Sequence, residues 1–310
     1  MRCVSRSLLL TLALGLMLPT APAQSEQKIV FDLGCKELSD LYVMDSSGSN
    51  ARRVTHEAES GRVAAQPVWV PGGRQIAFTL ITITNGRHRS DVYVVNPDGT
   101  GLRSLTQTAG QASSWHPTWS PDGSKVAFQS DRDGNTELYT MNADGSGLRR
   151  LTHTPGTGRY AGQPAWSPDG QQIAFDSDRS GREEIYLFDV KTSHVRALTE
   201  TANGKESWNA DWSPDGSSIV FGSNRDGDDE IYTMHADGSN VRRLNIKAYR
   251  PRWSPDGKRL IYMSETGETS LQIFTAAPDG SDISRLSNSK CPSRHPDWCC
   301  RPLAASSPRP

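Results

Sequence analysis

One tripeptide, Trp-Ser-Pro, recurs four times in this chain, and Asp-Gly follows each copy. A degenerate copy of this segment begins at Trp69. A further copy begins at Trp298, where the C-terminal tail takes the place of its remaining residues. The tryptophans recur about every 40 to 50 residues, and a period in this range is typical of a repeat architecture. One such unit cannot bury its own apolar faces, whereas stacked neighbours can. The six copies begin at Trp69, Trp119, Trp166, Trp212, Trp253 and Trp298.

Each unit contains short runs of β-branched and aromatic residues, which predict strands. In one unit these runs are Lys125–Phe128, Glu137–Tyr139 and Arg149–Thr152, and they follow the tryptophan strand. Tight turns join them. In Ser120–Gly123 a proline stands where φ of about −65° is needed, and a glycine stands where φ becomes positive. Each unit is therefore predicted to form four antiparallel strands, which is the structure of a propeller blade.

The two ends of the chain complement each other. The first unit, from about Gln27 to His56, has three strands but no tryptophan strand before them. The last tryptophan strand, from His295 to Cys299, has no further strands after it. We expect this strand to complete the N-terminal blade, which gives an all-β, six-bladed β-propeller over residues 24–300. An open array or a different number of blades is the alternative.

The N-terminus has the pattern of a secretory signal peptide. Arg2 and Arg6 precede the apolar run from Leu8 to Leu18, and small residues precede Gln24. We expect cleavage after Ala23, so that residues 1–23 are a signal peptide, with a membrane anchor as the alternative. No later stretch is apolar enough to span a membrane, and residues 301–310 are expected to be a disordered tail. The mature protein is expected to be periplasmic or secreted, and monomeric.

The sequence excludes several classes of function. A formal net charge of −1 provides neither the basic surface of a nucleic-acid-binding protein nor a polybasic membrane patch. The chain contains no Gly-x-Ser-x-Gly nucleophile motif, no phosphate-binding glycine loop and no paired-cysteine metal site. Its carboxylates occupy repeated turn positions, and no pair stands out as acid and base. We therefore predict no catalytic residue, no cofactor and no bound metal.

Three repeated segments carry a resemblance to a known family. They are Pro117 to Gly123, Ser130 to Gly134 and Asn142 to Ser146, with counterparts in other units. Blades with these segments resemble the TolB-like β-propeller family, and the match covers nearly all of the chain after residue 23. The resemblance implies a propeller and a role as the periplasmic partner of an outer-membrane lipoprotein.

The same resemblance also includes proteins with other roles. Propellers of this type precede serine peptidase domains and occur in lyases that act on pectate fragments. We find no counterpart in this sequence of such a hydrolase domain, nor of the α/β domain that precedes the propeller in the family's namesake. The resemblance is therefore specific for the fold and leaves the function open.

The loops of one face differ between the units, whereas the Ser-Pro-Asp-Gly turns of the other face are nearly identical. Variation within a rigid repeat marks the expected binding face, and the uniform turns are expected to be structural. On the variable face, six polar residues open the innermost strands and are expected to form a ring at the channel mouth. The alternative is that they bond only to water and neighbouring backbone. The polar ring is Gln66, His116, Gln163, Asn209, Arg250 and His295.

Aromatic and arginine residues in the same loops are a second set of candidate binding residues. Exposed aromatics beside arginine are typical of protein contact surfaces, and aromatics also stack on sugar rings. Coverage of the blade edges is the alternative. We therefore expect a non-catalytic propeller that binds a protein or glycan partner, with a role in organising the cell envelope. The residues are Trp115, Arg132, Tyr160, Arg179, Trp208, Arg225 and Tyr249.

The polar ring also supports an alternative function. A carbohydrate-active lyase or hydrolase would place its site at the channel mouth, where His116 and His295 could help to hold a metal. Arg250 opposes a cation there, and the spacing contains no His-x-x-x-His signature. A metal assay on variants of both histidines would separate an enzyme from a binding protein.

Four cysteines follow the expected signal peptide. Cys35 aligns with Arg132 in a variable-face loop of the first blade, and Cys291 lies just before the strand that completes that blade. We therefore predict a Cys35–Cys291 disulfide that closes the ring. Cys299 and Cys300 are expected on the opposite face, where they could bond to each other, stay free or link to another chain.

Overall fold

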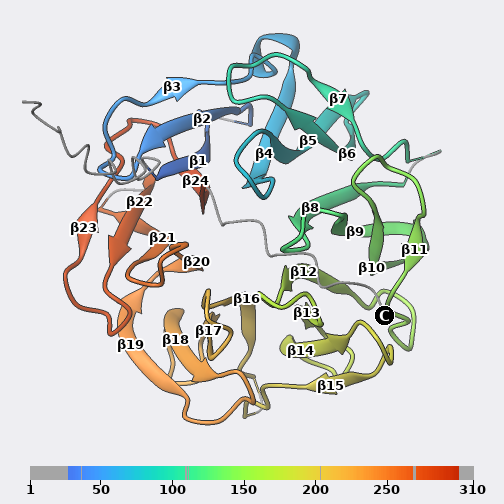
Figure 1. Ribbon diagram of the computed structural model, residues 1–310, viewed down its shortest axis with the longest axis vertical. Helices are drawn as coiled ribbons and strands as arrows, with labels where there is room; N and C mark the ends of the chain where they lie inside the picture. Colours follow the sequence, from blue (N-terminus) through green and yellow to red (C-terminus); the bar gives the residue numbers. More distant parts are fainter. Residues whose placement is uncertain are drawn as a thin grey trace, which may run out of the picture.

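In the computed structural model, six four-stranded antiparallel sheets surround a central channel (Figure 1). The structure describes residues 27–35, 37–108, 110, 112–202, 204–267 and 270–299. The expected signal peptide, 1–23, and the expected tail, 301–310, lie outside these residues. The six-bladed, all-β propeller predicted from the tryptophan repeat is confirmed.

The strands of each blade follow one another from the channel outward. Blade 1 contains β24 (Ser293–Trp298), β1 (Lys28–Leu33), β2 (Asp40–Asp45) and β3 (Arg52–Arg53). Blade 2 contains β4 (Arg62–Trp69), β5 (Ile76–Thr84), β6 (Arg87–Val95) and β7 (Arg103–Ser104). Blade 3 contains β8 (Ser114–Trp119), β9 (Lys125–Asp133), β10 (Asn135–Asn142) and β11 (Arg149–Arg150).

The second half of the ring repeats the same arrangement. Blade 4 contains β12 (Ala161–Trp166), β13 (Gln172–Ser177), β14 (Glu184–Asp189) and β15 (Val195–Ala197). Blade 5 contains β16 (Ser207–Trp212), β17 (Ser218–Ser223), β18 (Glu230–His235) and β19 (Arg242–Lys247). Blade 6 contains β20 (Tyr249–Trp253), β21 (Leu260–Thr266), β22 (Ser270–Ala276) and β23 (Ser284–Arg285). A short 3₁₀ helix, η1 (Ala58–Ser60), precedes β4, and no helix of the described ranges has the length and apolarity to cross a membrane.

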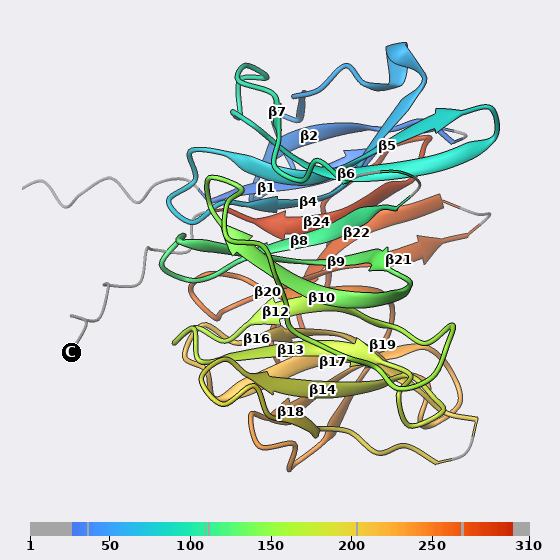
Figure 2. The ribbon, with the colours of Figure 1, turned by 90° about the vertical axis from the view of Figure 1, so that its right-hand side faces the viewer.

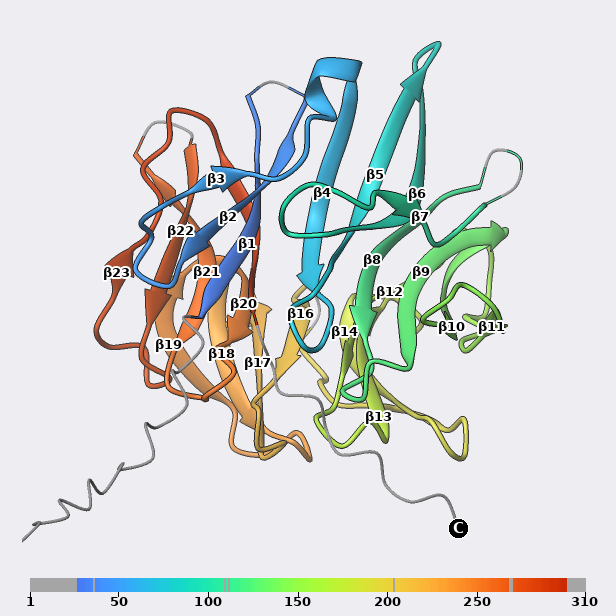
Figure 3. The same ribbon diagram turned by 45° about the horizontal axis from the view of Figure 1, so that its top comes forward.

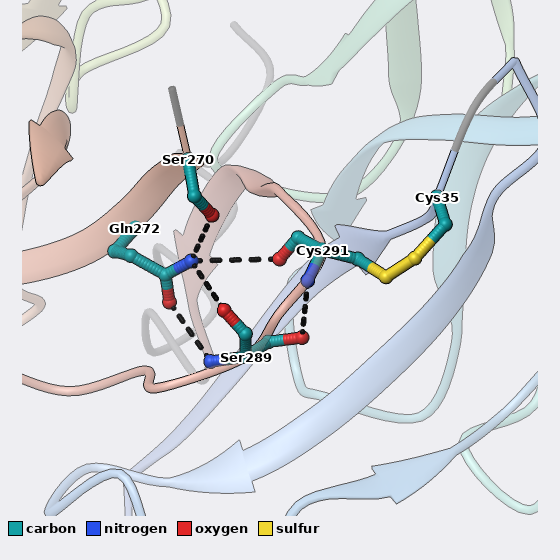
Figure 4. The surroundings of a disulfide bond; sticks show 5 residues. All are labelled: Cys35, Ser270, Gln272, Ser289 and Cys291. Carbon is teal, nitrogen blue, oxygen red and sulfur yellow. Dashed lines mark hydrogen bonds between the residues drawn. A yellow bond between two sulfur atoms is a disulfide. The ribbon is translucent and has the colours of Figure 1, made fainter. Parts of the chain in front are cut away.

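The two ends of the described chain meet in blade 1. β24 pairs antiparallel with β1, and Trp298 lies opposite Ile29. Cys35 and Cys291 form the predicted disulfide, with their Cα atoms 4.9 Å apart (Figure 4). Cys299 is also disulfide-bonded, and its partner lies outside the described residues. Strand pairing and a covalent bond therefore both close the ring.

The core lies between neighbouring blades. In every blade, an aromatic residue of the second strand packs on one of the third strand, with ring centroids 5.8–6.1 Å apart. The six repeat tryptophans are only 2–8% exposed, and Trp212 packs against Ile185 and Leu187 of the preceding blade. The apolar faces that one unit cannot bury alone are therefore buried by its neighbours.

The hairpin turns sort onto two faces. In the turn after β8, Ser120 Oγ donates to Asp122 Oδ1 at 2.6 Å, and Gly123 has a φ of 69°. These turns lie on one face, whereas the β5–β6 hairpin extends from the opposite face (Figures 2 and 3). β5 and β6 have nine residues each, compared with six in β13 and β14, so this hairpin is longer than that of blade 4.

Candidate functional site

All six residues of the polar ring have a left-handed backbone conformation, with φ between 49° and 56°. Each lies at a β-bulge, where the register between the inner strand and the second strand shifts. Proline follows five of the six, and proline fits here because it has no N–H to offer to a ladder. A positive φ is uncommon for residues other than glycine and costs free energy that the surrounding structure must offset.

Hydrogen bonds between blades hold most of these strained residues. Asp32 Oδ1 accepts from the backbone N–H of Gln66 at 3.2 Å, although the two belong to neighbouring blades. Gln129 and Asp176 accept in the same way from the N–H groups of Gln163 and Asn209, at 2.7 and 2.8 Å. The bulges are therefore positioned by the adjacent second strand, which gives the ring a rigid geometry.

The ring surrounds a narrow part of the channel. Five of its members, Gln66, His116, Gln163, Arg250 and His295, line one cavity of about 30 Å³. Asn209 is not among the lining residues. A cavity of this size holds about one small group or one or two waters. The ring therefore forms a constriction rather than a wide funnel.

Hydrogen bonds assign the protonation state of His116. Arg250 Nη1 donates to His116 Nε2 at 3.2 Å, and His116 Nδ1 lies 3.0 Å from Gln129 Oε1. Nε2 must accept and Nδ1 must donate, so the ring is the neutral tautomer with its proton on Nδ1. Burial lowers the pKa of His116 well below its ordinary value, and Arg250 lowers it further. His116 is therefore neutral near pH 7.

His295 and Arg250 complete the charged part of the constriction. His295 Nδ1 lies 2.6 Å from Asp32 Oδ1, and burial lowers the pKa of His295 although Asp32 opposes this shift. Burial also lowers the pKa of Arg250 to about 10, with a further contribution from Arg252. Arg250 therefore keeps its positive charge near pH 7, beside two histidines whose pKa values are lowered.

Blade 4 places carboxylates beside the ring. Asp176 is fully buried, and its Oδ1 has no hydrogen-bond partner among the described residues. Burial raises the pKa of Asp176 well above its ordinary value, and the charge of Glu183 adds to this effect. Burial likewise raises the pKa of Glu183, which accepts a hydrogen bond from the Tyr160 hydroxyl. Tyr160, a candidate contact residue, is therefore engaged within the fold.

We expect Asp176→Asn to be more stable than the native protein at pH 7 and equally stable near pH 4. Because the pKa of Asp176 is raised in the folded state, its ionisation opposes folding as pH rises above 3.8, its ordinary value. Asparagine removes that opposition and can still accept from Asn209. Urea unfolding at several pH values measures the difference. Asp237→Asn is the control of opposite sign, because Ser239 lowers the pKa of Asp237. Parallel pH profiles for the two variants would contradict this expectation.

The three candidate arginines stabilise their own blades. The guanidinium carbons of Arg132, Arg179 and Arg225 lie 4.9–5.4 Å from the centroids of a Phe and a Tyr in the same blade. The Nε of each also donates to a serine Oγ two residues earlier, as Arg132 does to Ser130 at 3.0 Å. Their contacts are thus structural, with only the remaining exposed edges available to a partner.

The candidate aromatics stand beside the ring. Trp115, Trp208 and Tyr249 are half-buried, and each directly precedes a ring residue. Trp208 packs over Gly222, where a Cβ would lie 2.6 Å from the indole Nε1. The packing over Gly222 therefore fixes the position of the Trp208 indole.

The structure also shows a wide opening that sequence reasoning missed. A cavity of about 390 Å³ lies at the face of the uniform turns, which were expected to be structural only. It shares Val68, Arg252 and Asp297 with the constriction, so the two spaces adjoin each other. The proline that follows Trp-Ser in each full copy was a signal for this apolar rim. The rim includes Trp69, Trp119, Trp166, Trp298, Pro71, Pro121, Pro168, Pro214 and Pro255.

No group of three or more His, Cys, Asp or Glu side chains in the described part of the chain is arranged to hold a metal ion.

Together, the fold and the channel define a six-bladed β-propeller with a constriction between the variable loop face and the turn face. The chain belongs to the family described as the TolB beta propeller domain, whose model matches residues 58–163 and 157–300.

Two curated relatives and one solved structure illustrate the similarity. The chain is 40% identical over 86 residues to a protein TolB homolog of Chlorobium luteolum, and 33% identical over 113 residues to the Tol-Pal system protein TolB of Alcanivorax borkumensis. These matches cover 28% and 36% of this chain, but only 18% and 25% of those proteins. The crystal structure of TolB from Acinetobacter baumannii matches with a TM-score of 0.74 and 24% identity, over 87% of this chain and 66% of that one. At this identity the structural match shows the fold alone.

Proposed function

We propose that this chain is an exported, non-catalytic propeller that binds a protein partner of the cell envelope through its variable loop face and channel. The observation that carries the proposal is the set of half-buried aromatics around the constriction, Trp115, Trp208 and Tyr249. Their partial burial limits their side-chain freedom, so a partner would contact them at a reduced cost in side-chain entropy. Aromatic side chains held in this way are typical energetic centres of protein interfaces.

The β5–β6 hairpin adds a raised contact element on the same face (Figure 3). Arg87, His88 and Arg89 are exposed near its tip, beside a hollow of about 750 Å³. The corresponding hairpin of blade 3 is almost as long, since its strands β9 and β10 have nine and eight residues. The two hairpins therefore project from one side of this face, where a partner could contact them.

Family membership and the disulfide support the envelope location. The chain matches a family described as the TolB beta propeller domain, and one relative is a Tol-Pal system protein. The Cys35–Cys291 bond is typical of proteins that fold in an oxidising compartment. Together with the expected signal peptide, these observations favour export over a cytoplasmic location.

Affinity capture from an envelope extract of the source cells tests the proposal. We expect the full chain to capture a defined protein, and Trp115→Ala to weaken capture about tenfold or more, as loss of an interface centre does. Leu148→Ala is the matched control, because Leu148 is 49% exposed on the outer part of blade 3. A thermal melt of each variant reports whether the fold is kept.

Two outcomes would oppose the proposal. Equal capture by the native chain and Trp115→Ala would remove the aromatic face from the interaction. Capture that survives digestion of the extract with a protease, but not treatment with glycosidases, would show a glycan partner instead of a protein.

A further inference from the structure

Arg250 is a charged side chain of the channel that makes no direct ion pair with the described residues. It is half-buried, and its side-chain hydrogen bond goes to the neutral His116 at 3.2 Å. It forms no ion pair with any carboxylate of the described residues, whereas its neighbour Arg252 pairs with Asp211 at 3.3 Å. A guanidinium in a partly buried site is best satisfied by a hydrogen-bonded partner of opposite charge. A guanidinium that lacks such a partner is therefore a candidate binding group.

Blade 5 has no carboxylate at the position from which it could contact the ring residue of blade 6, Arg250. In blades 1 and 4, the second strand presents Asp32 and Asp176 toward the ring residue of the next blade. The equivalent residue of blade 5 is Gly222, which pairs with Trp208 in β16 as its counterparts pair in their blades. Trp208 occupies the space that a side chain at Gly222 would need. Blade 5 therefore gives Arg250 no carboxylate at ion-pair distance, and the charges of Asp176, Asp32 and Glu183 act on it only from further away.

We propose that the constriction binds a carboxylate group at Arg250. The planar guanidinium offers paired N–H donors that match the two oxygens of a carboxylate. Gln66 supplies a further donor, because its Oε1 accepts from the Thr79 hydroxyl at 2.8 Å and its NH₂ group has no partner in the described part of the chain. The cavity of about 30 Å³ admits one such group, and not a bulky anion.

The wide opening on the turn face is the proposed route. It adjoins the constriction, because Val68, Arg252 and Asp297 line both spaces. The carboxylates on this route are already engaged: Asp211 accepts from Arg252, and Asp297 accepts from the backbone N–H of Trp69 at 2.8 Å. A carboxylate that enters therefore meets Arg250 as the unpaired charge. The group could be carried by a free organic acid or by an acidic side chain of a bound chain.

Titration of the full chain with small probes tests the proposal independently of any protein partner. Sodium acetate is compared with acetamide at constant ionic strength, with isothermal titration and tryptophan fluorescence as readouts. We expect acetate to bind and acetamide not to bind. Arg250→Gln should weaken binding about tenfold or more, since hydrogen bonds between charged groups are the strong ones. Arg242→Gln, an exposed arginine of β19, should leave it unchanged.

A blocked peptide with one glutamate, compared with the same peptide carrying glutamine, distinguishes the two sources. Binding of acetate assigns the site to free carboxylates, and preference for the glutamate peptide without acetate binding assigns it to an acidic side chain. Both outcomes support the carboxylate site if Arg250→Gln abolishes them. If neither probe distinguishes carboxylate from amide, or if Arg250→Gln binds as the native protein does, the proposal is wrong.

Discussion

Replacement of Cys35 by serine is expected to lower the free energy of unfolding by about 3–5 kcal/mol. The Cys35–Cys291 bond spans a sequence separation of 256, so its loss returns a large loop-closure entropy to the unfolded chain. In the folded state it joins the β1–β2 loop to the segment that leads into β24 (Figure 4). Without it, β24 is held to β1 by strand pairing alone. Urea unfolding of the oxidised protein measures the loss.

The second cysteine supplies the control for this expectation. Cys291→Ser alone, and the double variant, should each lose the same free energy as Cys35→Ser, because all three remove one bond. Gln272 still holds the segment after the bond is lost, since its Nε2 donates to the backbone oxygens of Ser289 and Cys291 at 3.0 and 3.4 Å. Losses that add in the double variant, or a Cys35→Ser protein as stable as the native one, would show that the bond does not stabilise the ring.

The closure of the ring was predictable because it follows from counting repeats. The first unit lacks a tryptophan strand, and no further strand follows the last tryptophan strand. Both can satisfy their exposed strand edges only by pairing with each other. β24 and β1 pair in this way, and the disulfide follows from the same alignment, which places Cys35 and Cys291 on one face. The fold could therefore be read from local patterns that recur at a fixed period.

The geometry of the channel was less predictable, because it depends on backbone conformation and on neighbouring blades. The polar ring was identified from its position before the Pro-x-Trp segment, but its left-handed φ values and bulges carry no unambiguous sequence signal. They place the ring at a constriction. The contacts of Arg132 also depend on packing, since its guanidinium lies 4.9 Å from the ring centroid of Tyr139. Composition alone cannot separate such a stacked arginine from one that faces a partner.

A repeated carboxylate contact also emerges only from the structure. In five blades, an acidic or amide side chain of the third strand accepts a hydrogen bond from a Thr or Ser hydroxyl 15 residues later. This contact fastens the loop that leads to the next blade. Blade 5 is the exception, because β19 runs on to Lys247 and almost meets β20 at Tyr249, so it has little loop to fasten. The residues are Asp40, Asp91, Glu137, Glu184 and Gln272.

Glu184→Ala is expected to lower the free energy of unfolding by about 3–5 kcal/mol, as the loss of one member of a buried charged network does. Glu184 is 2% exposed and accepts from the Thr199 hydroxyl and from the backbone N–H of Thr201, both at 2.6 Å. Alanine leaves these donors buried without an acceptor. Differential scanning calorimetry and urea unfolding measure the loss.

Gln272→Ala is the matched variant in blade 6, and a smaller loss is expected there. Gln272 is neutral, and it accepts from the Ser287 hydroxyl at 2.9 Å and from the N–H of Ser289 at 3.1 Å. Its removal frees weaker donors and no charge is involved, so about 1–3 kcal/mol should be lost. Equal losses in the two variants would mean that the charge of Glu184 adds nothing to the contact.

Because the loop that Glu184 fastens continues into Trp208 and Asn209, loosening of this loop should also weaken partner capture at temperatures where the fold persists. Capture by Gln272→Ala should change less, because the loop that Gln272 fastens leads to β24, which does not carry one of the candidate aromatic residues.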